Sequence, residues 1–341
     1  MLRYSLLSAL TVPLLWAAPA DLRSQEPARA PWKIGALLWH RPENDLQALA
    51  GLQAALRIAG RPHVVLIEDA DSDRERALEA LRRFAAQKVD AVVALGTQAA
   101  LLCKEHVRDR PVVFTAVTNP VESGICPDWS GSGTSLAGNS NWVPSDTVLG
   151  LFRRAVPRLG RLGILRSQDT GVVSLAELKA MERHLAEPVD GRPRIELVEE
   201  RAVDVADLGP AVQRLAEAGC EAIWVPIDFL VYENMERVTE AAAAARVPLV
   251  SSSLRGALSG AVAGVFTDYG MLGERAALIL LQILEGGADP ARIPVGTMRG
   301  YQVVVNLGAA RRLGYELPLP LLAVADRILD EEQGEAVEDR R

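Results

Sequence analysis

The sequence predicts an α/β fold of two doubly wound parallel-sheet lobes joined by a multi-strand hinge. Short, continuously apolar runs alternate with amphipathic stretches along the chain, which is the pattern of buried parallel strands and their crossover helices. The same alternation resumes after a loop at 122–135 that is rich in Gly, Ser and Pro, so a second lobe follows the first. Several apolar runs end at hydroxyl or amide residues, and the carboxyl ends of parallel strands line the ligand crevice in such folds.

The first lobe is predicted to begin near Trp32 and to contain four β-α repeats. Its first helix ends at Gly60, a residue typical of helix C-termini. Its second helix carries apolar residues at helical spacing. The predicted strands are 33–39, 63–67, 89–95 and 112–116, and the predicted helices are 45–59, 73–87 and 97–106. Right-handed crossovers connect repeats of this kind.

The second lobe repeats the rhythm of the first. Its predicted helices are 144–156, 174–185, 204–218 and 232–245, and its predicted strands are 162–165, 195–199, 222–226 and 247–251. A further strand at 262–266 precedes a long helix at 268–284, which two glycines end. A strand at 301–306 and a helix at 308–313 close the pattern. These last elements must complete both sheets, so the chain crosses between the lobes several times.

We place the crossings near Asn141, Gly260 and Pro290. The cleft between two such lobes is the natural ligand site. The predicted organisation is a signal peptide at 1–20, a leader at 21–31, lobe one at 32–141 plus 261–290, lobe two at 142–260 plus 291–329, and a polar tail at 330–341.

The N-terminus predicts export. Arg3 is followed by an apolar run that ends at Ala18-Pro19-Ala20, a pattern typical of signal-peptide cleavage. A membrane anchor is the alternative, but the run is shorter than the roughly 20 residues that span a bilayer. No Cys lies near the cut, so we expect a soluble periplasmic monomer and not a lipoprotein.

Composition narrows the function classes. The net charge of −7 argues against nucleic acid as a partner, because such proteins need a basic face. The four histidines are scattered, so we expect no metal site and no cofactor. Cys103 and Cys126 are a possible disulfide in an oxidising compartment, whereas Cys220 is expected to be a buried hydrophobe. No nucleophile motif is present, which favours a binding protein over an enzyme.

Six motifs in order resemble one family. They are 94–100, 113–121, 222–228, Asp268-Tyr269 with Leu272-Gly273, 304–307 and 321–326. The chain thereby resembles the substrate-binding proteins of ABC transporters, in the branch with a type I periplasmic-binding fold that includes tryptophan and tyrosine binders. The resemblance covers about 34–329 and implies a small-molecule ligand, an ABC permease in the inner membrane as partner, and hinge closure around the ligand.

Two acids of the family pattern are replaced by amides. The family's Thr-Asp-Pro is Thr118-Asn119-Pro120, and its Ser-Asp is Ser140-Asn141. The polar turn that the family places after the first strand of lobe two is also rebuilt, at 168–173. A carboxylate pairs with an ammonium group through a charge-assisted hydrogen bond, and an amide gives up that charge. The resemblance therefore implies the fold and the role more directly than the family's aromatic ligand.

The candidate ligand-binding residues follow from these strand ends. Lobe one offers Trp39, Thr97, Gln98, Thr118 and Asn119, with Ser140 and Asn141 at the first crossing. Lobe two offers Asp228 and Ser252, and the start of the long helix at 268–284, which is assigned to lobe one, offers Asp268 and Tyr269. Each has a structural alternative: helix capping for the hydroxyl and carboxylate residues, a turn for Asn119, a hinge at the first crossing, and core packing for Trp39.

Two functions remain open at this point. The first is the extracytoplasmic component of an ABC importer that captures a small polar molecule, such as an amino acid, in the cleft. The alternative is a periplasmic sensor that presents its ligand to a membrane receptor, because one fold serves both uses.

Overall fold

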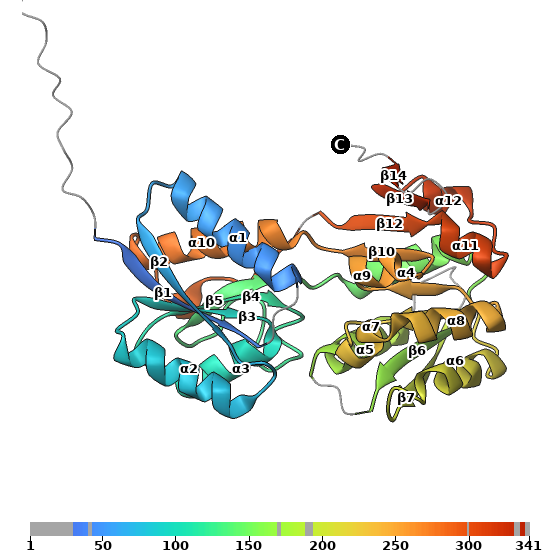
Figure 1. Cartoon of the computed structure of the whole chain (residues 1–341), viewed down its shortest axis with the longest axis horizontal. Coiled ribbons are helices and arrows are strands. Elements are labelled where there is room, and N and C mark those ends of the chain that lie inside the picture. Colours follow the sequence, from blue (N-terminus) through green and yellow to red (C-terminus); the bar gives the residue numbers. More distant parts are fainter. Residues whose placement is uncertain are drawn as a thin grey trace, which may run out of the picture. The chain divides into compact units, whose positions relative to one another are not determined.

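The computed structural model describes residues 30–39, 43–168, 172–187, 194–298, 300–330 and 335–337. The predicted signal peptide, most of the leader and most of the polar tail lie outside these residues. Residues 31–341 form one compact unit, and its described part contains two sheets with helices (Figure 1). The predicted fold class is confirmed.

The first sheet has the strand order β11-β5-β4-β3-β1-β2, and every neighbouring pair is parallel. Its strands are β1 (Trp32–Leu38), β2 (His63–Asp69), β3 (Ala91–Leu95), β4 (Val112–Val117), β5 (Leu136–Ser140) and β11 (Gly296–Thr297). Its helices are α1 (Glu43–Ile58), α2 (Arg74–Ala86), α3 (Thr97–His106) and α10 (Tyr269–Leu284). Helices α2 and α3 cover one face of this sheet, and α1 and α10 cover the other (Figure 1).

The second sheet has the order β14-β13-β12-β10-β9-β8-β6-β7. Its strands are β6 (Arg161–Ser167), β7 (Glu196–Ala202), β8 (Ala222–Val225), β9 (Leu249–Ser251), β10 (Ala263–Phe266), β12 (Gln302–Asn306), β13 (Arg327–Asp330) and β14 (Glu335–Val337). Its helices are α4 (Ser145–Ala155), α5 (Val172–Ala186), α6 (Leu208–Glu217), α7 (Phe229–Glu233), α8 (Met235–Ala245), α9 (Leu254–Leu258), α11 (Leu307–Leu313) and α12 (Leu319–Leu322), and a 3-10 turn, η1 (Pro290–Arg292), precedes β11. Strand β12 is antiparallel to β10, and β14 is antiparallel to β13, so this sheet is mixed and not purely parallel.

Two of the three crossings lie later in the chain than the sequence predicts. Strand β10 pairs with β9 and β12 in the second sheet, so the second crossing follows Phe266 and does not lie near Gly260. Strand β11 pairs with β5 in the first sheet, so the third crossing lies between β11 and β12 and not near Pro290. The first crossing follows β5, which ends at Ser140. Lobe one therefore takes α10, η1 and β11, whereas β10 belongs to lobe two.

Strand β5 was not predicted from the sequence. Its residues Leu136–Ser140 include Gly, Asn and Ser, which have low strand propensity. All five are buried between β4 and β11, so the tertiary contacts override that propensity. The Asn139 side chain accepts a hydrogen bond from the Thr115 hydroxyl at 2.9 Å and donates one to the Leu272 carbonyl at 2.9 Å. A polar strand is therefore satisfied inside the core.

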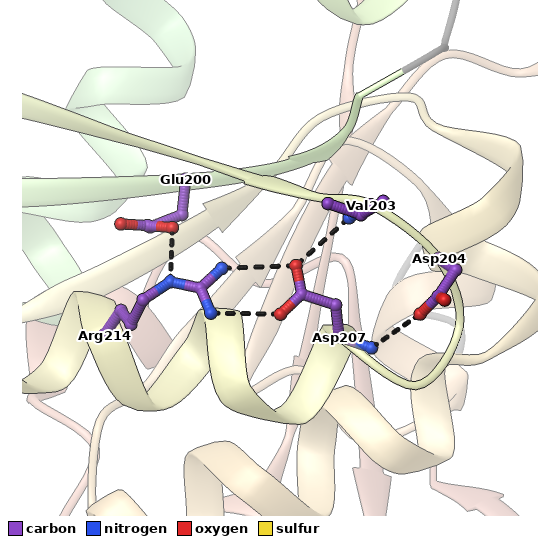
Figure 2. A network of polar contacts seen from close by, with 5 residues as sticks. All are labelled: Glu200, Val203, Asp204, Asp207 and Arg214. Atoms are coloured by element: carbon purple, nitrogen blue, oxygen red, sulfur yellow. Dashed lines mark hydrogen bonds and ion pairs between the residues drawn. The ribbon is translucent and has the colours of Figure 1, made fainter.

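An ion-pair network fixes the connection between β7 and α6 (Figure 2). The guanidinium of Arg214 contacts Asp207 at 3.0 Å and Glu200 at 2.8 Å. The hydrogen bonds from Arg214 hold the pKa of Asp207 below its usual range. The Asp207 carboxylate also accepts from the Val203 amide, and the Asp207 amide donates to Asp204. None of these residues lines the two cavities described below, and such exposed pairs add little stability.

Helices α1 and α10 approach each other through small residues. A Cβ added to Gly273 would lie 1.7 Å from the Ala48 carbonyl oxygen, and a Cβ added to Gly51 would lie 2.1 Å from the Gly270 oxygen. Such distances leave no room for any side chain. The two glycines therefore set the spacing of the helix pair that covers this face of lobe one.

We expect Gly273→Ala to lower the free energy of unfolding by about 1–3 kcal/mol, because the methyl group forces the two helices apart. The matched control is Gly209→Ala in α6, where an added Cβ would lie 3.9 Å from its nearest neighbour, Ala241. The control should be neutral or slightly stabilising. Urea unfolding measures both variants, and equal stabilities would show that the helices repack freely.

Candidate functional site

Two adjoining cavities lie where residues of both lobes meet. The first, here called the aromatic cavity, has a volume of about 220 Å³ and is lined by residues that include Trp39, Asp45, Thr97, Gln98, Thr118, Phe229 and Tyr232. The second, the hinge-side cavity, has a volume of about 390 Å³ and is lined by residues that include Glu177, Ser252, Thr267, Asp268, Gln302 and Arg327. The two cavities share Asn44, Asn141, Ile227, Ser253 and Tyr269 in their walls.

The N-terminus of α3 forms one wall of the aromatic cavity. Gly96 precedes the helix with a φ of 88° and provides no side-chain cap. The first N–H groups of a helix have no partner within the helix, and they present a partial positive charge. The Thr97 hydroxyl accepts a hydrogen bond from the Thr118 amide at 3.3 Å, which fixes the two strand ends side by side. Thr97 and Gln98 therefore line a wall suited to an anionic group.

The end of β4 carries backbone strain next to this wall. Ala116 has a φ of 56° and Asn119 a φ of 38°, a region that non-glycine residues seldom adopt. The register between β4 and β5 also shifts between Phe114 and Val117. Ala116 lines the aromatic cavity. Strained backbone gathers at ligand sites more often than elsewhere.

A chain of hydrogen bonds joins β4 to two crossings. The Thr118 hydroxyl donates to Asn141 Oδ1 at 3.0 Å, and Asn141 Nδ2 donates to the Tyr269 hydroxyl at 2.9 Å. Asn141 lies on the first crossing, and Tyr269 begins α10 directly after the second crossing. Both side chains line both cavities. A change at either crossing would therefore reach the cavity walls directly.

Lobe two contributes Ser252 and the second crossing contributes Asp268 to the hinge-side cavity. The Ser252 hydroxyl accepts a hydrogen bond from Trp224 Nε1 at 2.9 Å. The Asp268 carboxylate accepts from the Met271 amide at 3.0 Å and so caps α10. Asp268 therefore both caps α10 and lines the hinge-side cavity. Trp39, at the end of lobe one's first strand, lines the aromatic cavity and packs partly against the core.

Three of the proposed residues line neither cavity. Asn119 accepts a hydrogen bond from the Glu122 amide at 3.2 Å within a turn. The Ser140 hydroxyl donates to the Val117 carbonyl at 2.8 Å. The Asp228 carboxylate accepts from the Ser167 amide at 2.8 Å and caps α7 through the Val231 amide at 3.3 Å. The structure gives all three internal partners.

Sequence reasoning missed Asp45. This carboxylate is only 7% exposed, lines the aromatic cavity and has no hydrogen-bond or ion-pair partner in the described part of the chain. Burial raises the pKa of the Asp45 carboxyl to about 7. Its position in the first turn of α1, where acidic residues are common, concealed it.

Glu177 was missed as well. It lies on α5, is 4% exposed and lines the hinge-side cavity. It accepts a hydrogen bond from the Ile227 amide at 2.6 Å and another from the Ser252 hydroxyl. Burial nevertheless raises the pKa of Glu177 to about 7. A usable signal was present, because Glu177 stands between two apolar residues, Ala176 and Leu178, on a helix that must bury one face.

The cysteines are not bonded in this structure. Cys103, Cys126 and Cys220 are all free and buried. Burial raises the pKa of Cys103 to about 12 and that of Cys126 to about 11, which makes both thiols unreactive. The disulfide that the sequence left possible is therefore not formed here, and both residues pack as small hydrophobes in the α2–α3 face of lobe one.

Comparison with known proteins identifies the family. The family model of the ABC transporter substrate-binding proteins matches residues 41–329. The chain belongs to this family. A tyrosine-binding protein of Clostridioides difficile (strain R20291) is 25% identical over 239 residues, which are 70% of this chain and 67% of the relative. The family consists of solute-binding proteins and is not an enzyme family.

Solved structures agree with the fold. A structure in complex with L-Trp from Streptococcus pneumonia has a TM-score of 0.75 at 22% identity and covers 88% of this chain and 100% of its own. A ligand-free, open substrate-binding protein with adhesive properties from Clostridium difficile has a TM-score of 0.70 at 23% identity, with 84% of this chain and 96% of its own covered. This solute-binding protein therefore has the type I periplasmic-binding fold.

Two features are absent from the described residues. These residues contain no helix that is both long and apolar enough to cross a bilayer. They also contain no group of three His, Cys, Asp or Glu side chains that could hold a metal ion.

Proposed function

We propose that this protein is the extracytoplasmic component of an ABC importer and that it captures an α-amino acid between its two lobes. The family membership supports the importer role. Relatives named for tyrosine binding and for a complex with L-Trp support an amino acid as ligand. The residues of the aromatic cavity support it independently.

The observation that carries the proposal is the position of Asp45 beside the N-terminus of α3. A Cβ added to Gly96 would lie 3.6 Å from Asp45 Oδ2, so an unpaired carboxylate faces the start of the helix. An α-amino acid carries its ammonium and carboxylate groups on one carbon. Asp45 would pair with the ammonium group, and the backbone N–H groups of Thr97 and Gln98 would bind the carboxylate.

The other lining residues receive roles that follow from their chemistry. Trp39 and Tyr269 would pack against the ligand side chain, and Asn141 would hold Tyr269 in place. Ser252 and Asp268 would face the distal end of the ligand from the hinge-side cavity. We assign Asn119, Ser140 and Asp228 to positioning the walls, because each is engaged by internal hydrogen bonds.

Closure would occur by rotation about the three crossing segments, as in hinge-bending binding proteins. An ion pair between Glu122 of lobe one and Arg183 of α5 joins the two lobes outside the crossings. Exposed pairs of this kind contribute little energy. The pair would therefore guide the closed arrangement, and the ligand would supply most of the stabilisation.

Thermal unfolding of the mature protein with each common L-amino acid tests the ligand class. A bound ligand at 100 times its Kd stabilises the folded state by about 2.7 kcal/mol and should raise Tm by several degrees. Calorimetric titration then gives the affinity. If no amino acid changes Tm or produces heat, the proposed ligand class is wrong.

Uptake measurements test the importer role separately. Cells that lack the gene should lose high-affinity uptake of the amino acid that the protein binds, and a plasmid copy should restore it. Unchanged uptake, together with confirmed binding, would refute the role in import and leave the binding function intact.

A further inference from the structure

The two cavities contain one buried carboxylate from each lobe. Asp45 belongs to lobe one and lines the aromatic cavity, and Glu177 belongs to lobe two and lines the hinge-side cavity. Both side chains are more than nine-tenths buried. Burying an ionised carboxylate is costly unless a cation or strong hydrogen bonds compensate it. The position of two such groups in adjoining cavities therefore needs an explanation.

No cationic side chain compensates them within the described residues. Arg255 lines the aromatic cavity and Arg327 lines the hinge-side cavity, but neither forms an ion pair with Asp45 or Glu177. The other acids in the walls are Glu233, which is exposed, and Asp268, which caps α10. The two buried carboxylates of the walls thus have no ion-pair partner among the described residues.

A second observation points to a ligand group in the hinge-side cavity. Thr267 lines this cavity and is 2% exposed, and its hydroxyl has no hydrogen-bond partner among the described residues. Buried hydroxyl groups are nearly always hydrogen-bonded in native proteins. The hinge-side cavity therefore holds both a buried carboxylate that has no ion-pair partner among the described residues and a hydroxyl that has no hydrogen-bond partner there.

A ligand that extends through both cavities would contact both carboxylates. The two cavities share five wall residues, and Tyr269 is one of them. Tyr269 thus borders the cavity that Asp45 lines as well as the cavity that Glu177 lines. Aromatic rings also attract cations through their faces. The wall between the two acids therefore suits a chain that carries a positive charge at each end.

We propose that the ligand is a basic, diamino L-amino acid whose α-ammonium group pairs with Asp45 and whose side-chain ammonium group pairs with Glu177. This inference rests on the proposed function and specifies its substrate class. An aromatic or aliphatic amino acid would pair with Asp45 alone, and would leave the Glu177 carboxylate without a counter-charge and the Thr267 hydroxyl without a hydrogen-bond partner.

Calorimetric titration at pH 7.5 with L-lysine, L-ornithine and L-norleucine tests the inference, because norleucine resembles lysine without the second amino group. We expect the better of the two diamino acids to bind about 10- to 100-fold more tightly than norleucine, the range for a hydrogen bond between charged groups. In Glu177→Gln this ratio should approach one, while the Kd for norleucine stays near its original value. Glu182→Gln, at an exposed position on the same helix, is the matched control and should keep the original ratio.

A second measurement needs no variant. Nε-acetyl-L-lysine keeps the length of lysine but removes its side-chain charge, so it should bind at least about 10-fold more weakly than lysine. The inference is overturned if norleucine, acetyl-lysine, L-tryptophan or L-tyrosine binds as tightly as the diamino acids, and the proposed function then stands. If no amino acid binds at all, both the inference and the proposed function fail.

Discussion

Replacing Asp45 with Asn should weaken amino-acid binding by about 10- to 100-fold, because a hydrogen bond between two charged groups contributes about 1.5–3 kcal/mol. The substitution keeps the size of the side chain and removes only its charge. Asp45 has no partner in the described part of the chain. The loss should therefore appear in the affinity for the ligand and not as damage to the fold.

The stability of the free protein separates a binding defect from misfolding. The Asp45→Asn variant no longer has to bury an ionisable group, so at pH 8 its ligand-free form should unfold at an equal or higher urea concentration than the wild type. Glu75→Gln, at an exposed position in α2, is the control and should change neither property. An Asp45→Asn protein that is stable and binds with unchanged affinity would remove Asp45 from the site.

The rule that strand ends line the crevice accounts for most of the site that could be predicted. Thr97, Thr118 and Asn141 come from three segments that the sequence alone places at one sheet edge, and hydrogen bonds join them there. The repeated apolar runs similarly predicted two lobes. The spacing of apolar residues and the residue types at strand ends are local properties, so they can be read directly from a sequence.

The parts that could not be predicted depend on tertiary contacts. Asp228 also follows a strand, but its carboxylate accepts hydrogen bonds from the amide and the hydroxyl of Ser167, its neighbour in space. The two buried acids, Asp45 and Glu177, lie on helices and not at strand ends, so the rule about strand ends could not predict them. Strand β10 was placed in the wrong lobe because nothing in its four apolar residues specifies which sheet they join.

The same two acids make a prediction about pH. The pKa of Asp45 rises from an ordinary value of 3.8 to about 7, and that of Glu177 rises from 4.5 to about 7. Between these values the folded protein binds more protons than the unfolded chain, so stability falls as pH rises. Between pH 5 and pH 8 the ligand-free protein should lose on the order of 2 kcal/mol for each group.

Urea unfolding of the ligand-free protein at pH 5, 6, 7 and 8 measures this loss. Asp45→Asn and Glu177→Gln should each reduce the slope, and the double variant should remove most of it. Exposed acids such as Asp109 and Asp128 have a pKa that their partners lower. Their contribution to stability is lost only in more acidic solution, so they do not affect the slope between pH 5 and pH 8. A wild-type stability that stays constant or rises from pH 5 to pH 8 would contradict the raised pKa values of the two buried carboxylates.

Ligand binding should show the opposite dependence on pH. An ammonium group pairs with an ionised carboxylate, so binding at pH 6 must release the proton that each acid holds in the free protein. Affinity should therefore increase from pH 6 to pH 8 while the stability of the free protein decreases. Titrations at pH 6 in two buffers with different ionisation enthalpies will detect proton release in the wild type, and the release should be smaller in Asp45→Asn. Because one pair of buried charges would cause both trends, the sensitivity of the free protein to pH and its affinity for the ligand should disappear together.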